Sequence, residues 1–291
     1  MVSKLRYTQF YLSVCTLAII ATLINFDMSS DNLIIMLALA VIFLGLPHGA
    51  LDFAVAKSMN FVPSISLAIR FIAVYMGIAA LSIIFWVYMP EAALVIFLSI
   101  SVFHFSADWR LSLPFFSRLG LASSLICGPS VFHSSTVTDL FTALLVTAEA
   151  ANWIVQGMRL TFYIGTLFFL YYVIRSLFRK KSPDVWQYIE WLAIIFSSLI
   201  LSPLIHFGLY FCLLHSPKHL QDVGVELGVS IKRAVIISLP FVILTIILGA
   251  VMYEFFGSDK LSNDLLRWIF IGLFGLTVSH MVLIHLWHGS D

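Results

Sequence analysis

Histidines interrupt four stretches of this sequence that are otherwise strongly apolar. The stretches are "GLPHGALD", "SVFHFSADW", "YFCLLHSPKHL" and "LTVSHMVLIHLWH". The histidines within the apolar runs are His48, His104, His215, His219 and His280, and the last stretch also carries His285 and His288 near its end. Neutral imidazoles bind iron, copper, zinc or nickel, and two histidines four residues apart lie on one face of a helix. The pattern therefore predicts a metal site within the apolar part of the protein.

Two aspartates accompany these histidines at helical spacing. Asp52 follows His48 by four residues, and Asp108 follows His104 by four, so each pair shares a helical face. A carboxylate beside a metal-bound imidazole orients the ring, and each aspartate is a candidate to do this for its own histidine or for a neighbouring one. Solvated carboxylates near helix ends are the alternative.

Aromatic residues gather around the same histidines. Those that could line a slot for a flat apolar molecule are Phe103, Phe105, Phe207, Tyr210 and Phe211. The alternative for each ring is packing between helices or contact with lipid.

Composition indicates the elements that must position these side chains. Of 291 residues, 61% are hydrophobic and 11% are charged, whereas soluble domains carry about 25% charged residues. Apolar runs of about 20 residues match the length that crosses ~30 Å of hydrocarbon. We therefore expect an all-α, polytopic membrane helix bundle forming a single domain over residues 1–291.

The net charge of +1 and the lack of a basic block argue against nucleic acid as a partner. The three cysteines have no CxxC spacing and are expected to be free thiols.

Hydropathy predicts about ten spans, with eight or nine as alternatives. They are placed at 8–27, 33–56, 66–88, 91–110, 119–133, 160–178, 186–203, 204–222, 234–256 and 265–287. The run 186–222 is divided at Pro203 because proline breaks helices, and 137–152 is assigned to the membrane interface. With both termini cytoplasmic, 13 of the 16 Lys and Arg residues lie on the inner side, as in a multi-pass protein of a bacterial inner membrane.

This topology predicts that the histidines lie at one depth. Each is on a span that runs inwards, roughly 12 to 16 residues from its expected start, and the rise is about 1.5 Å per residue. Four helices would then present imidazoles to one site. A lone histidine in a membrane usually bonds a neighbouring helix, and we expect that role for His133 and His206.

The motifs resemble those of the Brp/Blh family of membrane-bound β-carotene 15,15'-dioxygenases. "GLPHGALD", "FHF" followed by an aspartate, "YFCLLHSPKH" and "FIGLFGLTVSHMVLI" are similar to family segments in the same order, from about residue 40 to 290. The resemblance implies cleavage of β-carotene by dioxygen into two retinal molecules, with delivery of retinal to a rhodopsin as a further expectation. It implies Fe(2+) as cofactor, and its iron ligands fall on His48, His104, His215 and His219.

Some positions depart from the family pattern. Asp108 follows His104 by four residues rather than five, and His285 stands where an aspartate is expected. Pro217 separates the paired histidines, so we expect Ser216 to cap a new helix that has Pro217 at its first position. His280 is expected beside the substrate or behind the ligands, because a fifth imidazole would crowd the positions that dioxygen needs.

Two other function classes were weighed against this one. A di-iron lipid hydroxylase or desaturase needs histidines arranged in HxxHH clusters, and no HH pair occurs in the sequence. A transporter that relays protons through aspartate and histidine accounts for ionisable residues inside a membrane, but not for four histidines at one depth.

Overall fold

The computed structural model describes residues 2–26, 29–110, 112–178, 185–256 and 261–288, and its regular elements there are all helical. The all-helical prediction is thus confirmed for the described part of the chain. The contacts divide the chain into two compact units. The first unit is Met1–Ser29 with Leu94–His215, and the second unit is Ser30–Ala93 with Ser216–Asp291. The expectation of a single domain stays a prediction.

The first unit is built around two long helices that approach closely. Its elements are α1 (Val2–Leu23), most of α6 (Pro90–Ser106), η2 (Ala107–Trp109), α7 (Phe115–Phe132), α8 (Ser134–Ala143), α9 (Ala148–Phe178), α10 (Val185–Ile200), α11 (Pro203–Tyr210) and η3 (Phe211–His215). Helix α7 packs along α9, with α10 against α7 and α1. A Cβ atom on Gly165 would lie 2.7 Å from the Cβ of Ser123, so the absence of a side chain there permits the close approach.

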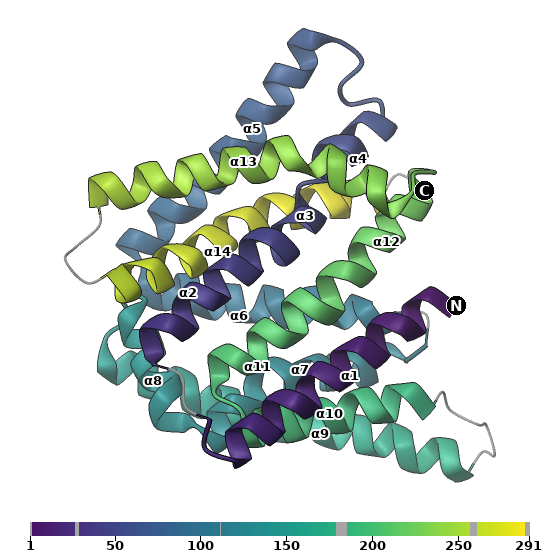
Figure 1. Ribbon diagram of the computed structural model, residues 1–291, viewed down its shortest axis with the longest axis vertical. Helices are drawn as coiled ribbons and strands as arrows, with labels where there is room; N and C mark the ends of the chain where they lie inside the picture. The colour runs from purple at the N-terminus through teal and green to yellow at the C-terminus, as the bar shows by residue number, and fades with distance from the viewer. Residues whose placement is uncertain (1, 27–28, 111, 179–184, 257–260, 289–291) are drawn as a thin grey trace. The chain divides into compact units, whose positions relative to one another are not determined.

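The second unit packs around its last helix. Its elements are α2 (Ser30–Ala40), η1 (Val41–Gly45), α3 (Leu46–Gly49), α4 (Asp52–Ser58), α5 (Ile65–Tyr88), α12 (Ser216–Glu226), α13 (Ile231–Phe256) and α14 (Leu261–His288). Helix α14 contacts α5, α2 and α13, and α13 and α14 are the green and yellow helices in the upper part of Figure 1. A Cβ atom on Gly275 would lie 3.0 Å from the carbonyl oxygen of Ala79, so glycine lets α14 lie close to α5.

Six helices among the described residues are long and apolar enough to cross a membrane. They are Ile65–Tyr88, Pro90–Trp109, Phe115–Phe132, Ala148–Phe178, Ile231–Val251 and Asp264–Leu286. The shorter segments Asp31–Gly45 and Val185–Ile200 are apolar as well. These helices support a membrane protein, while the count of ten spans and the orientation of the termini stay predictions.

Three expected segment boundaries are tested by the observed helices. The chain breaks between α10 and α11, which begins at Pro203, so the division there is confirmed. The expected span 33–56 is instead four elements, α2, η1, α3 and α4, because Gly45, Pro47 and Gly49 interrupt regular hydrogen bonding. The segment 137–152 is divided as well, since α8 ends at Ala143 and α9 already begins at Ala148.

Two π-helical turns adjoin the histidine motifs. η1 ends just before the "LPHG" turn α3, and η3 ends at His215, immediately before α12. A π-turn places one extra residue in the turn and redirects the side chains that follow. Pro217 is the second residue of α12, which follows η3 without a break, so the separate helix start expected there is not observed. The hydroxyl of Ser216, which we expected to cap that helix, donates to the carbonyl oxygens of Leu44 (2.5 Å) and Gly45 (3.1 Å).

Candidate metal centre

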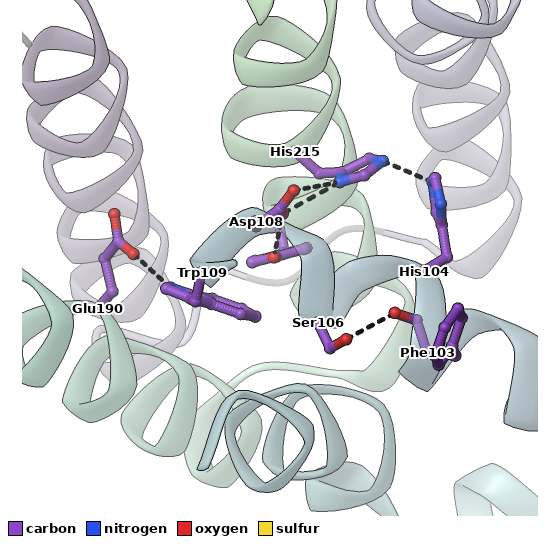
Figure 2. Close-up of polar contacts among 8 residues, drawn as sticks. Phe103, His104, Ser106, Asp108, Trp109, Glu190 and His215 are labelled. Atoms are coloured by element: carbon purple, nitrogen blue, oxygen red, sulfur yellow. Dashed lines mark hydrogen bonds and ion pairs between the residues drawn. The ribbon is translucent and has the colours of Figure 1, made fainter. Parts of the chain in front are cut away.

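His215, at the end of η3, is oriented by a carboxylate of the first unit. Its Nδ1 atom lies 3.0 Å from both oxygens of Asp108 on η2 (Figure 2). A carboxylate only accepts hydrogen bonds, so Nδ1 carries the hydrogen and the lone pair of the ring lies on Nε2. The two side chains are 1% and 7% exposed, which rules out the solvated alternative for Asp108. This is the arrangement that holds a metal-binding imidazole in place.

His104 on α6 faces the opposite edge of the His215 ring. The two Nε2 atoms are 3.1 Å apart, and the ring planes are inclined by 73° (Figure 2). Two nitrogens bound to one metal at ~2.1 Å, at an angle of about 90–109°, lie about 3.0–3.4 Å apart. The geometry of this pair therefore fits two imidazoles on one metal ion. Asp108 orients His215 rather than its own helical neighbour His104.

Tyr210 holds the carboxylate from its other side. Its hydroxyl donates to Oδ2 of Asp108 at 2.5 Å, and its ring lies parallel to the ring of His215. A buried phenol hydroxyl needs a hydrogen-bond partner, and here that partner is the aspartate. The tyrosine hydroxyl belongs to the chain of bonds Tyr210–Asp108–His215, and the expected place of Tyr210 in a substrate slot stays a prediction.

A buried glutamate that sequence reasoning missed fixes the turn carrying Asp108. Glu190 on α10 accepts hydrogen bonds from Thr8 (2.5 Å) and from the indole nitrogen of Trp109 (2.8 Å), and Figure 2 shows the latter. These bonds tie α1 and η2 to α10. The sequence signal was a glutamate within an apolar helix, which calls for a partner.

The second unit contains a matching arrangement built from three helices. Asp52 on α4 accepts a hydrogen bond from Nδ1 of His280 on α14 (2.8 Å) and another from the hydroxyl of Tyr75 on α5 (2.7 Å). Asp52 is 5% exposed, so it is not a solvated helix end. It orients His280, which lies on another helix. Sequence reasoning missed Tyr75, whose only signal was a hydroxyl in the middle of an apolar helix.

A second pair of histidines lies at this aspartate. The rings of His219 on α12 and His280 are 5.3 Å apart and inclined by 79°. The side chain of His48, on α3, lies outside the described part of the structure. Among the residues whose side chains are described, no group of three or more His, Cys, Asp or Glu surrounds a common metal position. The histidines instead form one pair in each unit, and the four-ligand set stays a prediction.

The expected aromatic residues divide into packed and exposed rings. Phe105 lies 4.6 Å from the ring of His215, and Phe211 stacks on the same imidazole at 6.0 Å. Phe207 stacks on Phe211 in turn. Phe105 and Phe211 thus cover the first histidine pair with apolar surface, and Phe207 packs behind Phe211. Phe103 differs from them, because it is 52% exposed.

His206 has the packing role expected for it. Nε2 lies 2.9 Å from the carbonyl oxygen of Leu125, to which it donates, and Nδ1 lies 2.9 Å from the hydroxyl of Ser197. Because Nε2–H donates to a carbonyl and Nδ1 is engaged by a hydroxyl, this imidazole joins helices and is not placed to bind a metal.

Comparison with known proteins agrees with the motifs. The family described as Beta-carotene 15,15'-dioxygenase matches residues 39–288. A protein of an uncultured marine bacterium, 66A03, named Beta-carotene 15,15'-dioxygenase, is 32% identical over 256 residues, which cover 84% of this chain and 90% of that protein. No solved structure matches the chain. With its histidine motifs inside the matched range, the chain belongs to the β-carotene 15,15'-dioxygenase family.

Proposed function

We propose that this protein cleaves the central 15,15' double bond of β-carotene with dioxygen to give two molecules of all-trans-retinal. One carbon–carbon double bond and the oxygen–oxygen bond break, and each of the two carbons gains one oxygen atom. The observation that carries the proposal is the histidine pair of the first unit, whose Nε2 atoms are 3.1 Å apart beside the Asp108 carboxylate. The pair offers a metal two ligands. It lies within an apolar helical protein, and a hydrocarbon substrate would dissolve in the membrane around such a protein.

We further propose that the metal is ferrous iron, with His48, His104, His215 and His219 as ligands, as the family motifs imply. When bound, iron supplies the activation of dioxygen, a triplet that reacts slowly with a closed-shell polyene. Neutral imidazoles suit iron, and the described part of the chain has no thiolate cluster that would favour another centre. Dioxygen requires that a coordination position remain open beside these ligands.

The residues around the first histidine pair hold the ligands and limit access of water. Asp108 keeps the proton of His215 on Nδ1, and Tyr210 keeps the carboxylate in position. Phe105 and Phe211 cover the imidazole with apolar rings. Cleavage of the double bond demands no general acid–base pair, so we assign these polar side chains to positioning.

The substrate would reach the site through the membrane. β-Carotene is a hydrocarbon that partitions into a bilayer, and we propose a multi-pass protein of a bacterial inner membrane with ten spans and both termini cytoplasmic. The aromatic residues proposed to contact the polyene, so that its central bond lies at the metal, are Phe103, Phe105, Phe207, Tyr210 and Phe211. Retinal is then a product that a rhodopsin in the same membrane can accept.

The proposed function is tested in cells that accumulate β-carotene. Cells that produce the protein are expected to lose orange colour and to gain retinal, measured by extraction and chromatography. Cells producing His104→Ala at equal abundance are the matched control and should keep their carotenoid. Unchanged carotenoid with an intact, iron-loaded wild-type protein would reject the proposal. Shorter apocarotenals in place of retinal would reject the central cleavage position.

A further inference from the structure

His280 in the second unit has the same polar surroundings as His215 in the first. In each case a buried aspartate accepts a hydrogen bond from Nδ1, and a tyrosine hydroxyl donates to that aspartate. The distances from nitrogen to carboxylate oxygen are 2.8 Å for His280 and 3.0 Å for His215. His280 is therefore held in the tautomer that has its lone pair on Nε2, which is the tautomer of a metal ligand bound through that atom.

The neighbour of His280 is also a histidine. Its ring lies 5.3 Å from that of His219 at 79°, compared with 4.8 Å and 73° for His104 and His215. The spacing and inclination of the two rings are close to those of His104 and His215, whose geometry fits adjacent ligands on one metal. His219 is one of the proposed iron ligands, so His280 lies next to a ligand.

The backbone next to His280 is joined to the helix that carries Tyr75. The hydroxyl of Ser279 donates to the carbonyl oxygen of Tyr75 (3.0 Å), which joins α14 to α5 at the residues that carry the cluster. The packing histidine His206 shows the contrast, because its Nε2–H donates to a backbone carbonyl. The His280 imidazole is therefore positioned by Asp52, by Tyr75 through Asp52, and by the helix contact at Ser279. Packing between two helices does not require so many polar bonds to one ring.

We propose that His280 is a direct iron ligand through Nε2, with Asp52 orienting the imidazole and Tyr75 orienting Asp52. The proposal rests on the iron-dependent function proposed above and adds a ligand to the four that the family resemblance implies. It differs from the sequence expectation, which placed His280 behind the ligands. With His280 among the ligands, the protein would hold iron through neutral imidazoles and would still have to leave access for dioxygen.

The test measures iron binding and not turnover alone. We would purify wild type, His280→Ala and His280→Gln in detergent without oxygen, load them with ferrous iron, and determine iron per chain and affinity. We expect the affinity to fall more than 100-fold in both variants, and imidazole added to His280→Ala should restore part of it. His285→Ala is the matched control, an exposed histidine on the same helix, and should bind iron like wild type.

A spectroscopic count of ligands separates coordination from positioning. Pulsed electron paramagnetic resonance of the ferrous–nitrosyl complex reports coordinated imidazole nitrogens, and we expect one fewer in His280→Gln than in wild type. Tyr75→Phe should weaken iron binding no more than about tenfold and leave that count unchanged. The count in wild type needs no substitution, so it decides the question even if a variant fails to fold.

The outcomes separate this proposal from the proposed function. Wild type that binds iron and forms retinal, with four coordinated imidazoles that His280→Gln leaves unchanged, would overturn the role of His280 alone. Wild type that binds no iron and forms no retinal would overturn the proposed function. Five imidazoles in wild type and four in His280→Gln would support both.

Discussion

The two units contain the same sequence of bonds, tyrosine to aspartate to histidine, assembled in different ways. In the first unit Tyr210 and His215 belong to one helical stretch, so two segments of chain complete the arrangement with Asp108. In the second unit Asp52, Tyr75 and His280 come from three helices, α4, α5 and α14. The second arrangement therefore depends on the packing of α14 against α5, and the first depends mainly on the turn η2.

The hydrogen bonds within the two arrangements also differ. Nδ1 of His215 lies 3.0 Å from both oxygens of Asp108. His280 and Tyr75 each bond a separate oxygen of Asp52. Loss of the tyrosine hydroxyl therefore leaves Asp108 with both oxygens near His215, but it leaves Oδ2 of Asp52 without the tyrosine donor. The comparison predicts that loss of the tyrosine hydroxyl has a larger effect in the second unit than in the first.

The largest effect should come from removing a proposed ligand. His104→Ala removes one of the two nitrogens that lie 3.1 Å apart, and we expect loss of bound iron and a fall in retinal formation of more than 100-fold. Iron content and retinal yield of purified protein measure this. A His104→Ala protein with full iron and activity would remove His104 from the ligand set, whereas His285→Ala should behave as wild type.

The two aspartates should respond alike if both arrangements serve a metal. Asp108→Asn and Asp52→Asn each remove the charge that orients an imidazole, and such changes reduce metal affinity or activity by ~10–100-fold. Iron titration and thermal unfolding of both variants in detergent measure the effects. An Asp52→Asn protein that loses stability but keeps its iron affinity would break the parallel and leave a structural role in the second unit.

Packing of α14 against α5 should matter for the second arrangement. In Gly275→Ala the added methyl group would lie 3.0 Å from the Ala79 carbonyl oxygen, and overpacking typically costs about 1–3 kcal/mol. Gly272→Ala, with nothing within 4 Å on the same helix, is the matched control. We expect a lower melting temperature and weaker iron binding for Gly275→Ala only. Equal behaviour of the two variants would show that the close approach of α14 is not required.

The smallest effect is the difference between the two tyrosines. Tyr75→Phe leaves a buried carboxylate oxygen without its donor, which costs about 1–3 kcal/mol. Tyr210→Phe should cost about 1 kcal/mol less, since both oxygens of Asp108 still face His215. Thermal unfolding of the two variants and of Tyr75→Phe/Tyr210→Phe measures the difference. Equal losses of unfolding free energy would mean that Asp52 and Asp108 depend equally on their tyrosine hydroxyls.

Composition and local spacing determined the class of this protein. Runs of apolar residues with few charges predicted an all-helical membrane protein, Pro203 predicted a helix start, and the histidine motifs pointed to the family to which the chain belongs. Each of these features depends only on residues within about 20 positions of one another, because hydropathy and the geometry of proline are properties of the local sequence. Burial of Asp52 and Asp108 was one of two alternatives that spacing left open.

Only the tertiary structure decided which histidine each aspartate orients. The four-residue spacing suggested His48 for Asp52 and His104 for Asp108 as readily as neighbouring ligands, whereas the observed partners are His280 and His215. Tyr75 and Glu190 went unnoticed for the same reason, because their partners lie on other helices. Helical periodicity predicts which side chains share a face of one helix. The partner on another helix depends on packing between segments as many as 228 residues apart in the sequence.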